Sequence, residues 1–578
     1  MIKKHLKQVF LKYLKTFRLL ILSTIKNHWP IIVVSVVFAA LLFRNPYNTR
    51  TLIPNFEPFP DTFHYVTVAR CFISQGTWGL CREGIQDALV GAQPSVPQAY
   101  SLSLLPVFLF NFDPRSFYFT NVFLSFISLG LIYLILGKVT KSQLIQTFIL
   151  LLLGTSYHIY WLPTLAMAEN LLVPLYVLSM YLLLIKKSRK QLFGLGAVAA
   201  AIFFTKYAYM PLSASILLFG VVLILKEHLP SIKKVPAFLK LTAQDVFVLL
   251  LPFVASLPFS HNFSQSVSFF VGLLTPVAST ATEKSGTTNS YFSLETLQTH
   301  LPKYLGVALG KPAQFLWDLR PWYSSSIGIG GLLGLLTGLW NKKYAVLSAF
   351  LVVSSLAQIT FMSTFYAFDT RYIYSAFFAI LIGVALILEF FNTNHVIQNG
   401  IKKIRLPKQV AVLGVLGILS VFLLVPRLGI VKAQLGLNLK YAETPWWYLS
   451  VLEYNSFFSN KRQEEPQLIS LTSPFMIDYY SNNTYVVLPF DEQQDFANQR
   501  ETVWGIPADQ TLVETYTQKL EAGENLYLAT YGKEANDHLR STFLMYQDTF
   551  ELTLEQEGCY NLCNIYSVAL KNTSIKSH

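Results

Sequence analysis

The chain has 578 residues, of which 53% are hydrophobic and only 13% are charged, and its mean hydropathy is +0.42. Soluble globular proteins carry roughly 25% charged residues, so a water-soluble enzyme of several domains is excluded. The 45 phenylalanines and 31 tyrosines exclude a disordered or collagen-like chain. A multi-span membrane protein with some aqueous part remains, and its net charge of +13 has to be explained by membrane topology first.

Apolar stretches long enough to cross a bilayer recur along the first three quarters of the chain. A spanning helix needs ~20 mostly apolar residues, or slightly fewer where flanking side chains snorkel. We expect a polytopic α-helical membrane protein with about eleven transmembrane helices, near residues 29–45, 117–137, 143–161, 169–185, 191–205, 211–227, 244–260, 324–340, 344–362, 372–390 and 410–426.

The basic residues predict the orientation of these helices. With the N-terminus in the cytoplasm, just over half of the 45 lysines and arginines fall in the cytoplasmic segments, although these segments are short. The C-terminus is then extracytoplasmic. No retention signal is seen in Ile575–His578, so we expect a plasma membrane. An endoplasmic-reticulum membrane, which has the same sidedness, is the alternative. The positive charge needs no nucleic-acid partner.

The predicted domains follow from this topology. Residues 1–28 form a basic cytoplasmic segment, of which Lys3–Ile25 reads as an interfacial helix. Residues 29–426 form the transmembrane domain, with long outer loops at 46–116 and 261–323. The stretch Tyr100–Phe110 is too short to span, and we expect an amphipathic helix in the outer interface there.

From residue 427 to residue 578 the composition becomes that of a soluble domain. Short strand-like runs at Gln467–Thr472, Tyr485–Leu488 and Leu526–Ala529 alternate with helical stretches at Thr511–Leu520 and Asn536–Tyr546. This alternation predicts a small extracytoplasmic α/β domain that ends in a hairpin.

The four cysteines all fall on the predicted outer side. Cys71 and Cys81 lie in the first outer loop, whereas Cys559 and Cys563 lie in the C-terminal domain. An even number of cysteines, close together in pairs, indicates two disulfides in an oxidising compartment. Four unpaired thiols are the alternative.

Ionisable residues near the spans gather at their predicted outer edge. In the first outer loop these residues are Asp61, His64, Tyr65, Arg82, Glu83 and Asp87, and further along the chain they are Glu169, Lys206, Asp369 and Arg371. Ion-coupled transporters place such groups near the membrane midplane instead. A site at the outer edge suits chemistry between a lipid in the membrane and a partner outside it.

The order of these residues resembles the GT-C class of membrane glycosyltransferases. The resemblance lies in Phe59–Pro60–Asp61 with Tyr65 and Ala69, Pro97 with Tyr100 and Pro106, Met167–Ala168–Glu169, Thr205–Lys206, and Arg371–Tyr372. It covers roughly residues 29–390 and is nearest to the protein O-mannosyltransferases and lipid A aminoarabinose transferases. No single motif is specific, but all five occur in order on the predicted outer side.

The resemblance implies an inverting transfer of a sugar from a polyprenyl-phosphate donor to a lipid, glycan or protein acceptor. Asp61 is then the candidate base, or the group that orients the acceptor hydroxyl. Glu169 is the second carboxylate, either as a partner of Asp61 or as a ligand, with Asp61, of a divalent cation such as Mg²⁺ or Mn²⁺. His64, Tyr65, Glu83 and Tyr372 are candidates for supporting roles or for binding the acceptor.

Lys206 and Arg371 are the candidate ligands of the donor phosphate, and Arg82 is a substitute for either. Residues 261–323 are expected to close over the substrate, because a loop of this class does so at that place. The C-terminal domain is expected to help bind the acceptor.

Each of these residues also has a structural interpretation. Asp61 would cap a helix, Glu169 would favour the N-terminal end of its helix dipole, Lys206 would snorkel, and Arg371 would pair with Asp369. His64 is more often a structural polar residue than a ligand. Two other functions stay open, a transporter or flippase of lipid or polysaccharide and a non-catalytic membrane scaffold.

Overall fold

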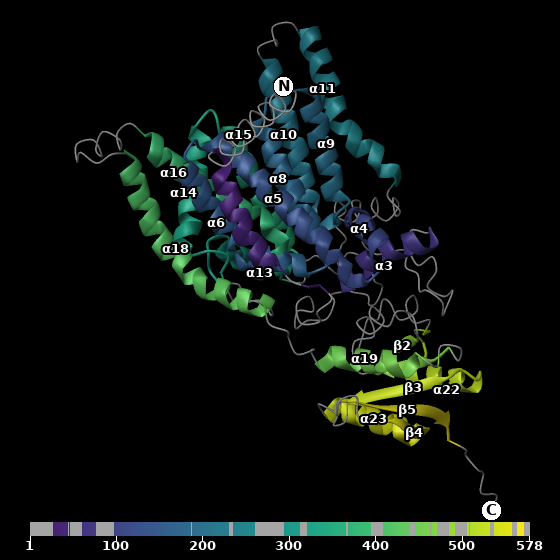
Figure 1. The fold of residues 1–578 in the computed structure, drawn as a ribbon. Coiled ribbons are helices and arrows are strands. Elements are labelled where there is room, and N and C mark those ends of the chain that lie inside the picture. The colour runs from purple at the N-terminus through teal and green to yellow at the C-terminus, as the bar shows by residue number, and fades with distance from the viewer. Residues whose placement is uncertain are drawn as a thin grey trace, which may run out of the picture.

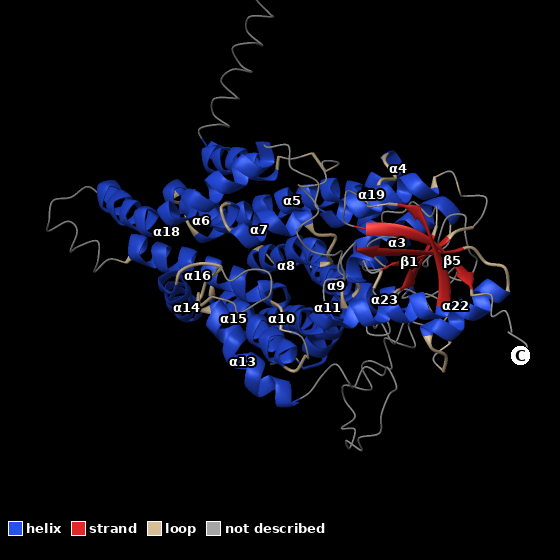
Figure 2. Cartoon of the chain, turned by 90° about the horizontal axis from the view of Figure 1, so that it is seen from below, coloured by secondary structure: helices blue, strands red, loops and turns tan. Residues whose placement is uncertain are grey.

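The computed structural model describes residues 27–43, 45–46, 60–76, 97–186, 188–229, 235–259, 294–312, 321–365, 368–394, 408–439, 446–459, 461, 465–470, 485–491, 506–507, 509–531, 537–557 and 563–571. Most of them form a helical bundle, and a smaller sheet-containing part follows at the C-terminal end (Figure 1). This sheet lies on the same side of the bundle as α3 (Pro60–Gln75) and α4 (Ala99–Phe110) in both ribbon views (Figures 1 and 2).

The bundle contains a helix at each of the eleven segments that the hydropathy pattern predicts. In chain order these helices are Asn27–Leu42, α5 (Phe117–Val139), α6 (Gln143–Gly154) with α7 (Tyr157–Trp161), α8 (Glu169–Leu184), α9 (Arg189–Phe203), α10 (Met210–His228), α11 (Val235–Ser256), α14 (Ser325–Trp340), α15 (Ala345–Ser363), α16 (Tyr374–Thr393) and α18 (Lys408–Leu439).

Five helical stretches within the described residues are both long and apolar enough to cross a membrane. They are Pro114–Val139, Tyr207–His228, Phe238–Ser256, Ala345–Ser363 and Thr370–Thr393. A sixth candidate is the pair Gln143–Gly154 and Tyr157–Thr164, which is bent by 57° at the break between them. The membrane fold is therefore clear, whereas eleven spans stay a prediction.

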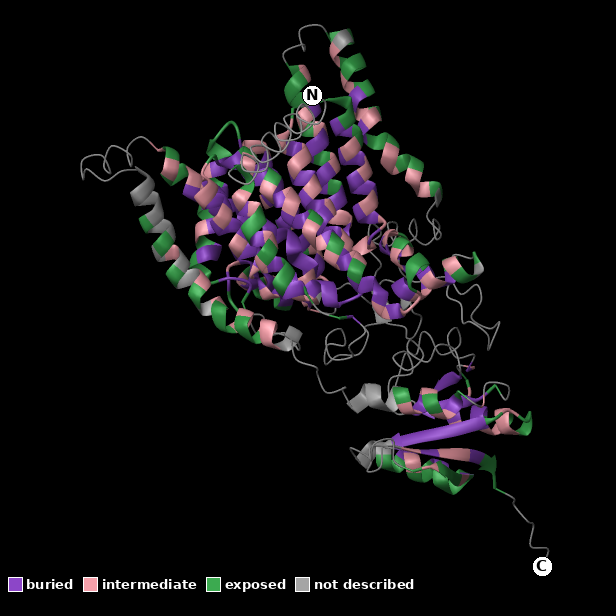
Figure 3. Ribbon diagram, viewed as in Figure 1, coloured by how far each residue is buried: buried purple, intermediate pink, exposed green. Residues whose placement is uncertain are grey.

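Helix α14 packs closely against α16. Gly331, Gly334 and Gly338 recur on α14 at a spacing of three to four residues, and a Cβ atom on Gly334 would lie only 1.8 Å from the carbonyl oxygen of Gly383 on α16. The two backbones are thus in direct contact, as small residues permit between membrane helices. Helix α16 is the most enclosed of the candidate spans, with 83% of its apolar window buried. In Figure 3 buried residues fill the interior of the bundle, and exposed ones lie on its outer helices.

The guanidinium group of Arg427 bonds helix α18 to the bundle, and apolar side chains of α18 such as Leu424 and Val431 pack against the same core. Arg427 donates to the carbonyl oxygen of Leu152 at 2.6 Å and to that of Trp322 at 2.9 Å. A longer contact of 3.4 Å reaches the Thr155 hydroxyl. These acceptors are carbonyls and a hydroxyl near the end of α6 and before α14, so Arg427 joins three segments.

Besides α3, helices α4 and α13 (Leu294–Ala308) lie outside the predicted spans. Helix α4 occupies the predicted interfacial stretch, and its 12 residues are too few to cross a bilayer. Its burial is one-sided, since Tyr100 and Leu104 are buried whereas Phe110 is 92% exposed. Helix α13 lies inside the loop predicted at 261–323. The polar stretch 284–290 of that loop is outside the described residues, as is the predicted helix Lys3–Ile25.

The C-terminal part is a five-stranded mixed sheet with the order β2-β1-β3-β5-β4. Its strands are β1 (Gln467–Ser470), β2 (Val486–Pro489), β3 (Leu526–Tyr531), β4 (Phe550–Gln556) and β5 (Cys563–Leu570). The first three strands are parallel, and β5 pairs antiparallel with both β3 and β4. The predicted strands and the final hairpin are confirmed.

Helices cover both faces of this sheet because the strands are apolar on both faces. On one face Leu468 and Tyr527 pack against Phe458 of α19 (Trp446–Phe458). On the other face Ile469 and Leu528 belong to a cluster with residues of α22 (Leu512–Glu521) and α23 (Asp537–Thr549). Alternate residues of each strand thus contribute to two different cores, as a pleated strand requires.

Candidate functional site

Two asparagines hold the non-helical segment that leads into α8. Asn121 of α5 donates to the carbonyl oxygens of Pro163 and Leu165, at 3.1 and 2.9 Å. Asn170 donates to those of Leu165 and Met167, at 2.8 and 3.0 Å. A buried backbone without helical hydrogen bonds needs such partners. The first residue of α8 is therefore placed by two side chains.

That first residue is Glu169, which is completely buried. Its Oε1 atom accepts a hydrogen bond of 2.5 Å from the Tyr209 hydroxyl. No hydrogen bond from the described residues reaches the Oε2 atom, which is also buried. Burial of a carboxylate is costly unless it is paired or hydrogen-bonded, and the helix dipole offsets only part of that cost. Glu169 therefore presents one unsatisfied acceptor at the end of the bundle.

Two cations lie around the ring of Tyr372, at the same end. The Lys206 ammonium is 5.3 Å from the ring centroid, and the guanidinium carbon of Arg371 is 5.2 Å from it. Arg371 also contacts the Met167 sulfur at 3.1 Å, two residues before Glu169. Residues from the α8 start, the turn after α9 and the start of α16 thus meet in space.

Asp369 connects this group to α13. Its carboxylate forms an ion pair of 2.5 Å with the Nε atom of Arg371, as the structural interpretation of Arg371 predicts. Its backbone N–H donates to the Tyr304 hydroxyl of α13 at 3.1 Å. Burial raises the pKa of the Asp369 carboxyl above its ordinary value, and Arg371 lowers it. Glu169 adds to the rise and Lys206 opposes it, so these three groups all lie near enough to Asp369 to influence its carboxyl.

The structure thus brings together four of the predicted site residues, Glu169, Lys206, Arg371 and Tyr372. Tyr65 lies nearby in α3, where its ring packs edge-to-face on Tyr100 with 5.1 Å between centroids. The Tyr100 hydroxyl in turn donates to Asn121 at 2.8 Å. Tyr65 is therefore a core residue that supports the same end of the bundle.

The structure describes only some of the other predicted site residues. Asp61 and His64 lie in the first two turns of α3, and their side chains are outside the described set. Arg82 and Glu83 are outside it entirely. Their roles stay predictions.

The structure also describes only some of the four cysteines. Cys71 of α3 is disulfide-bonded, but Cys81 lies outside the described residues, so the predicted pairing of the two is not tested. Cys559 and the Cys563 side chain are likewise outside them.

The described side chains do not by themselves make a metal site. Within them, no group of three or more histidine, cysteine, aspartate or glutamate residues is placed to hold an ion. Glu169 offers one unsatisfied oxygen, and the nearby Asp369 is already paired with Arg371. A divalent cation needs more oxygen ligands than this. Whether Asp61 completes a site stays a prediction.

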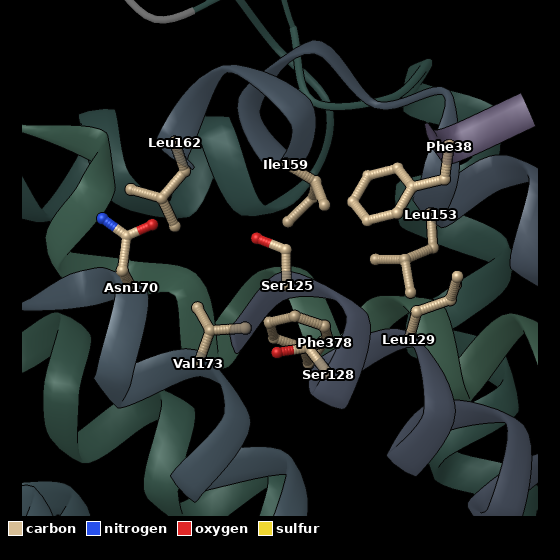
Figure 4. Close-up of a pocket in the computed structure, with 10 residues that line it drawn as sticks. All are labelled: Phe38, Ser125, Ser128, Leu129, Leu153, Ile159, Leu162, Asn170, Val173 and Phe378. Carbon is tan, nitrogen blue, oxygen red and sulfur yellow. The ribbon is translucent and has the colours of Figure 1, made fainter. Parts of the chain in front are cut away.

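A small cavity inside the bundle is lined by Asn170, the residue that follows Glu169 (Figure 4). Asn170, Ser125 and Ser128 line it together with apolar side chains, and the Oδ1 atom of Asn170 has no hydrogen-bond partner among the described residues. Its volume of about 20 Å³ is enough for one water molecule. The cavity is thus large enough for one water beside the Asn170 amide and too small for a sugar substrate.

The sequence pattern missed the residues that hold Glu169, Asp369 and the segment before α8 in place. Tyr209, Tyr304 and Asn121 were not singled out, because tyrosines are abundant and each contact joins residues far apart in the chain. For Asn121 a signal did exist, since an amide in an otherwise apolar span marks a hydrogen bond within a bundle.

Neither a family model nor a curated protein matches this sequence. Several solved structures do match its fold. One is ArnT from Cupriavidus metallidurans bound to undecaprenyl phosphate, with a TM-score of 0.57, 13% identity, and 94% of this chain and 98% of that chain covered.

Another is AglB, an archaeal oligosaccharyltransferase from Archaeoglobus fulgidus, in complex with an inhibitory peptide and a dolichol-phosphate. Its TM-score is 0.52 at 11% identity, and the match covers 88% of this chain and 70% of that chain. Both neighbours are GT-C glycosyltransferases. The chain therefore has the GT-C glycosyltransferase fold that its ordered outer-edge residues predicted.

Proposed function

We propose that the chain is an integral membrane glycosyltransferase that moves a sugar from a polyprenyl-phosphate donor to an acceptor at the extracytoplasmic face, with inversion. Its fold supports the reaction class, since the similar ArnT and AglB structures hold undecaprenyl phosphate and a dolichol-phosphate. The observation that carries the proposal is the meeting of a buried carboxylate, Glu169, with two cations at one end of this fold.

The proposed reaction is a single displacement. The acceptor hydroxyl attacks the anomeric carbon, the bond from that carbon to the phosphate oxygen breaks, and the Asp61 carboxylate takes the hydroxyl proton. The departing lipid phosphate gains negative charge, which Lys206 and Arg371 stabilise, together with Arg82 in the first outer loop. Glu169 orients the acceptor or Asp61 through its second oxygen.

A divalent cation, if one is bound, would add a Lewis acid at the carboxylates. Of the chain's residues, Glu169 and Asp61 would hold it, with further oxygens from water or from the phosphate. The steps proposed for Lys206 and Arg371 do not depend on it.

The location and partners follow from the same proposal. The protein spans a plasma membrane, with its N-terminus on the cytoplasmic side and its C-terminal domain on the outer side. That domain is on the same side of the bundle as α3 and α4, and this arrangement supports a role in binding a lipid, glycan or protein acceptor. Surrounding membrane lipids are the remaining partners.

The decisive experiment is transfer or hydrolysis by the purified protein with a panel of radiolabelled polyprenyl-phosphate sugars. We expect turnover in the wild type, and losses of 100-fold or more in Asp61→Asn and Glu169→Gln, on the order of what a general base or a buried charge contributes. The matched control is Asp113→Asn. Asp113 pairs with Arg115 at 2.7 Å between α4 and α5, so its loss should leave turnover unchanged.

Donor binding is measured in parallel on the same variants. A wild type that neither turns over nor binds any donor would overturn the proposal and favour a transporter or a scaffold. Full activity in both carboxylate variants, with donor still bound, would contradict the assigned roles.

A further inference from the structure

A polar cavity lies at the end of the bundle opposite to Glu169. Its volume is about 300 Å³, and it opens between the C-terminal ends of α14 and α16. The lining residues are Thr337, Gly338, Asn341, Lys343, Tyr344, Leu386, Glu389, Phe390 and Thr393. Glu389 is 18 residues after Arg371, which corresponds to about 27 Å along a helix. The cavity is therefore separate from the candidate site and belongs to the other membrane surface.

The ammonium group of Lys343 lines this cavity, and two of its three N–H donors have acceptors. The ammonium donates to the Lys138 carbonyl oxygen at 3.1 Å and to the Tyr344 hydroxyl at 2.7 Å. An ammonium has three donors, so one remains. The Asn341 side chain adds an amide group, whose oxygen accepts from the Lys343 backbone at 3.0 Å and whose N–H₂ has no hydrogen bond among the described residues. The cavity thus offers donors suited to a phosphate.

The carboxylate of Glu389 also lines the cavity, and its two oxygens differ in their hydrogen bonds. Its Oε2 atom accepts hydrogen bonds from the Thr140 hydroxyl at 2.6 Å and from the Asn392 amide at 3.1 Å. No hydrogen bond from the described part of the chain reaches its Oε1 atom. A carboxylate has about four acceptor positions, so it can still accept from a cationic donor.

Exposed apolar side chains border the cavity on the lipid side. Leu332, Leu333, Leu336 and Leu339 are exposed along α14, and Phe390 is exposed at the cavity itself. Trp340, at the end of α14, is 83% exposed, and tryptophan is typical of the membrane interface. An occupant with a polar head and acyl chains would place its head in the cavity and its chains along α14.

We infer that this cavity binds the head group of a phospholipid that carries both a phosphate and a protonated primary amine, that is, a phosphatidylethanolamine. Lys343 and Asn341 hold the phosphate, and Glu389 accepts from the ammonium. The pairing of one cation and one anion in the cavity argues against a purely anionic lipid, because Glu389 would repel it. A purely structural role, in which both residues only cap helix ends, would not explain why one donor of Lys343 and one oxygen of Glu389 stay without a bond to the described residues.

The test is lipid binding to the purified full chain, by native mass spectrometry and by the shift in unfolding temperature. Phosphatidylethanolamine is compared with its mono-, di- and trimethylated forms and with phosphatidylglycerol, all with the same acyl chains. We expect affinity to fall stepwise with N-methylation, by about tenfold from the primary amine to the trimethylated lipid, because that lipid has no N–H to donate. Equal binding of all these lipids would overturn the inference, and this comparison needs no variant.

Two variants separate the contributions. Glu389→Gln should remove the preference for the primary amine, because a neutral amide has no charge to attract it, while its oxygen still accepts from Thr140. Lys343→Gln should weaken binding of every phospholipid. Lys342→Gln is the matched control, since Lys342 is exposed and does not line the cavity. A folded Glu389→Gln protein that keeps the stepwise preference would contradict the assignment.

Discussion

The hydrogen bond from Tyr209 to Glu169 is the contact through which the candidate site can be tested most sharply. Tyr209→Phe removes only the hydroxyl and leaves both oxygens of a fully buried carboxylate without a hydrogen bond from the described residues. A hydrogen bond to a charged group contributes roughly 1.5–3 kcal/mol. If the bond holds Glu169 for the transition state, kcat/KM should fall about 10- to 150-fold.

The assay is sugar transfer with the best donor, measured as kcat/KM for the wild type, Tyr209→Phe, Glu169→Gln and the double variant. Tyr209 acts through Glu169, so its replacement should cost much less once Glu169 is a glutamine. If the fold losses in kcat/KM of the two single variants multiply in the double variant, the coupling is refuted. An unchanged kcat/KM in Tyr209→Phe would refute it as well.

Tyr176→Phe is the matched control for this experiment. Tyr176 is also a buried tyrosine of the bundle, and its hydroxyl bonds to Ser354 at 2.7 Å, two helical turns from Glu169 on α8. Its loss should cost stability of about 1 kcal/mol, as for a neutral hydrogen bond. Transfer by this variant should stay at the wild-type level, which separates a specific effect at the site from a general loss of packing.

Three further predictions concern stability, measured by thermal unfolding of the purified chain. Arg427→Met should destabilise the protein by about 3 kcal/mol, because it leaves several buried carbonyl groups without their charged donor, and an unchanged unfolding temperature would contradict the role given to that guanidinium. Gly334→Ala should be more severe, because the new methyl group meets the backbone of α16, whereas Gly330→Ala meets nothing within 4 Å and should be neutral. The backbone N–H and the hydroxyl of Thr511 both donate to the Glu514 carboxylate, and the two bonds together lower its pKa. Thr511→Ala removes the hydroxyl bond and leaves the backbone one, so it should destabilise the C-terminal part near neutral pH. A carboxyl whose folded pKa is lowered stabilises above its unfolded pKa and loses that contribution as the pH falls through the folded value, so the difference from wild type should shrink below about pH 4, and a constant difference would argue against the linkage.

Much of the architecture was predictable from the sequence. Hydropathy located the eleven apolar helices of the bundle, because a span must be apolar over its whole length whatever its neighbours are. Short apolar runs between helical stretches located strands β1, β2 and β3, because a strand that is covered on both faces is apolar at successive positions. Polar groups in the spans are costly, so the rare ionisable ones, such as Glu169, were recognisable as candidates from their position alone.

Helix α13 was not predicted, although its residues are in the printed sequence. It lies within a long polar loop, and its helical pattern is short and interrupted by Pro302. Tertiary contacts give it a place, since Tyr304 bonds to the backbone of Asp369. Short helices of this kind are stabilised by packing more than by their own propensity.

The sequence by itself determined that this protein lies in a membrane, where its helices run, and which ionisable residues gather at one edge. These features follow from the cost of placing polar groups in lipid, and that cost acts on each segment separately. Only the tertiary structure decided that Tyr209 holds Glu169, that Lys206 lies over the ring of Tyr372, and that Lys343 and Glu389 share a cavity. Each of these contacts joins different elements, and a hydrogen bond depends on positions to within a few tenths of an ångström, which packing of the whole bundle sets.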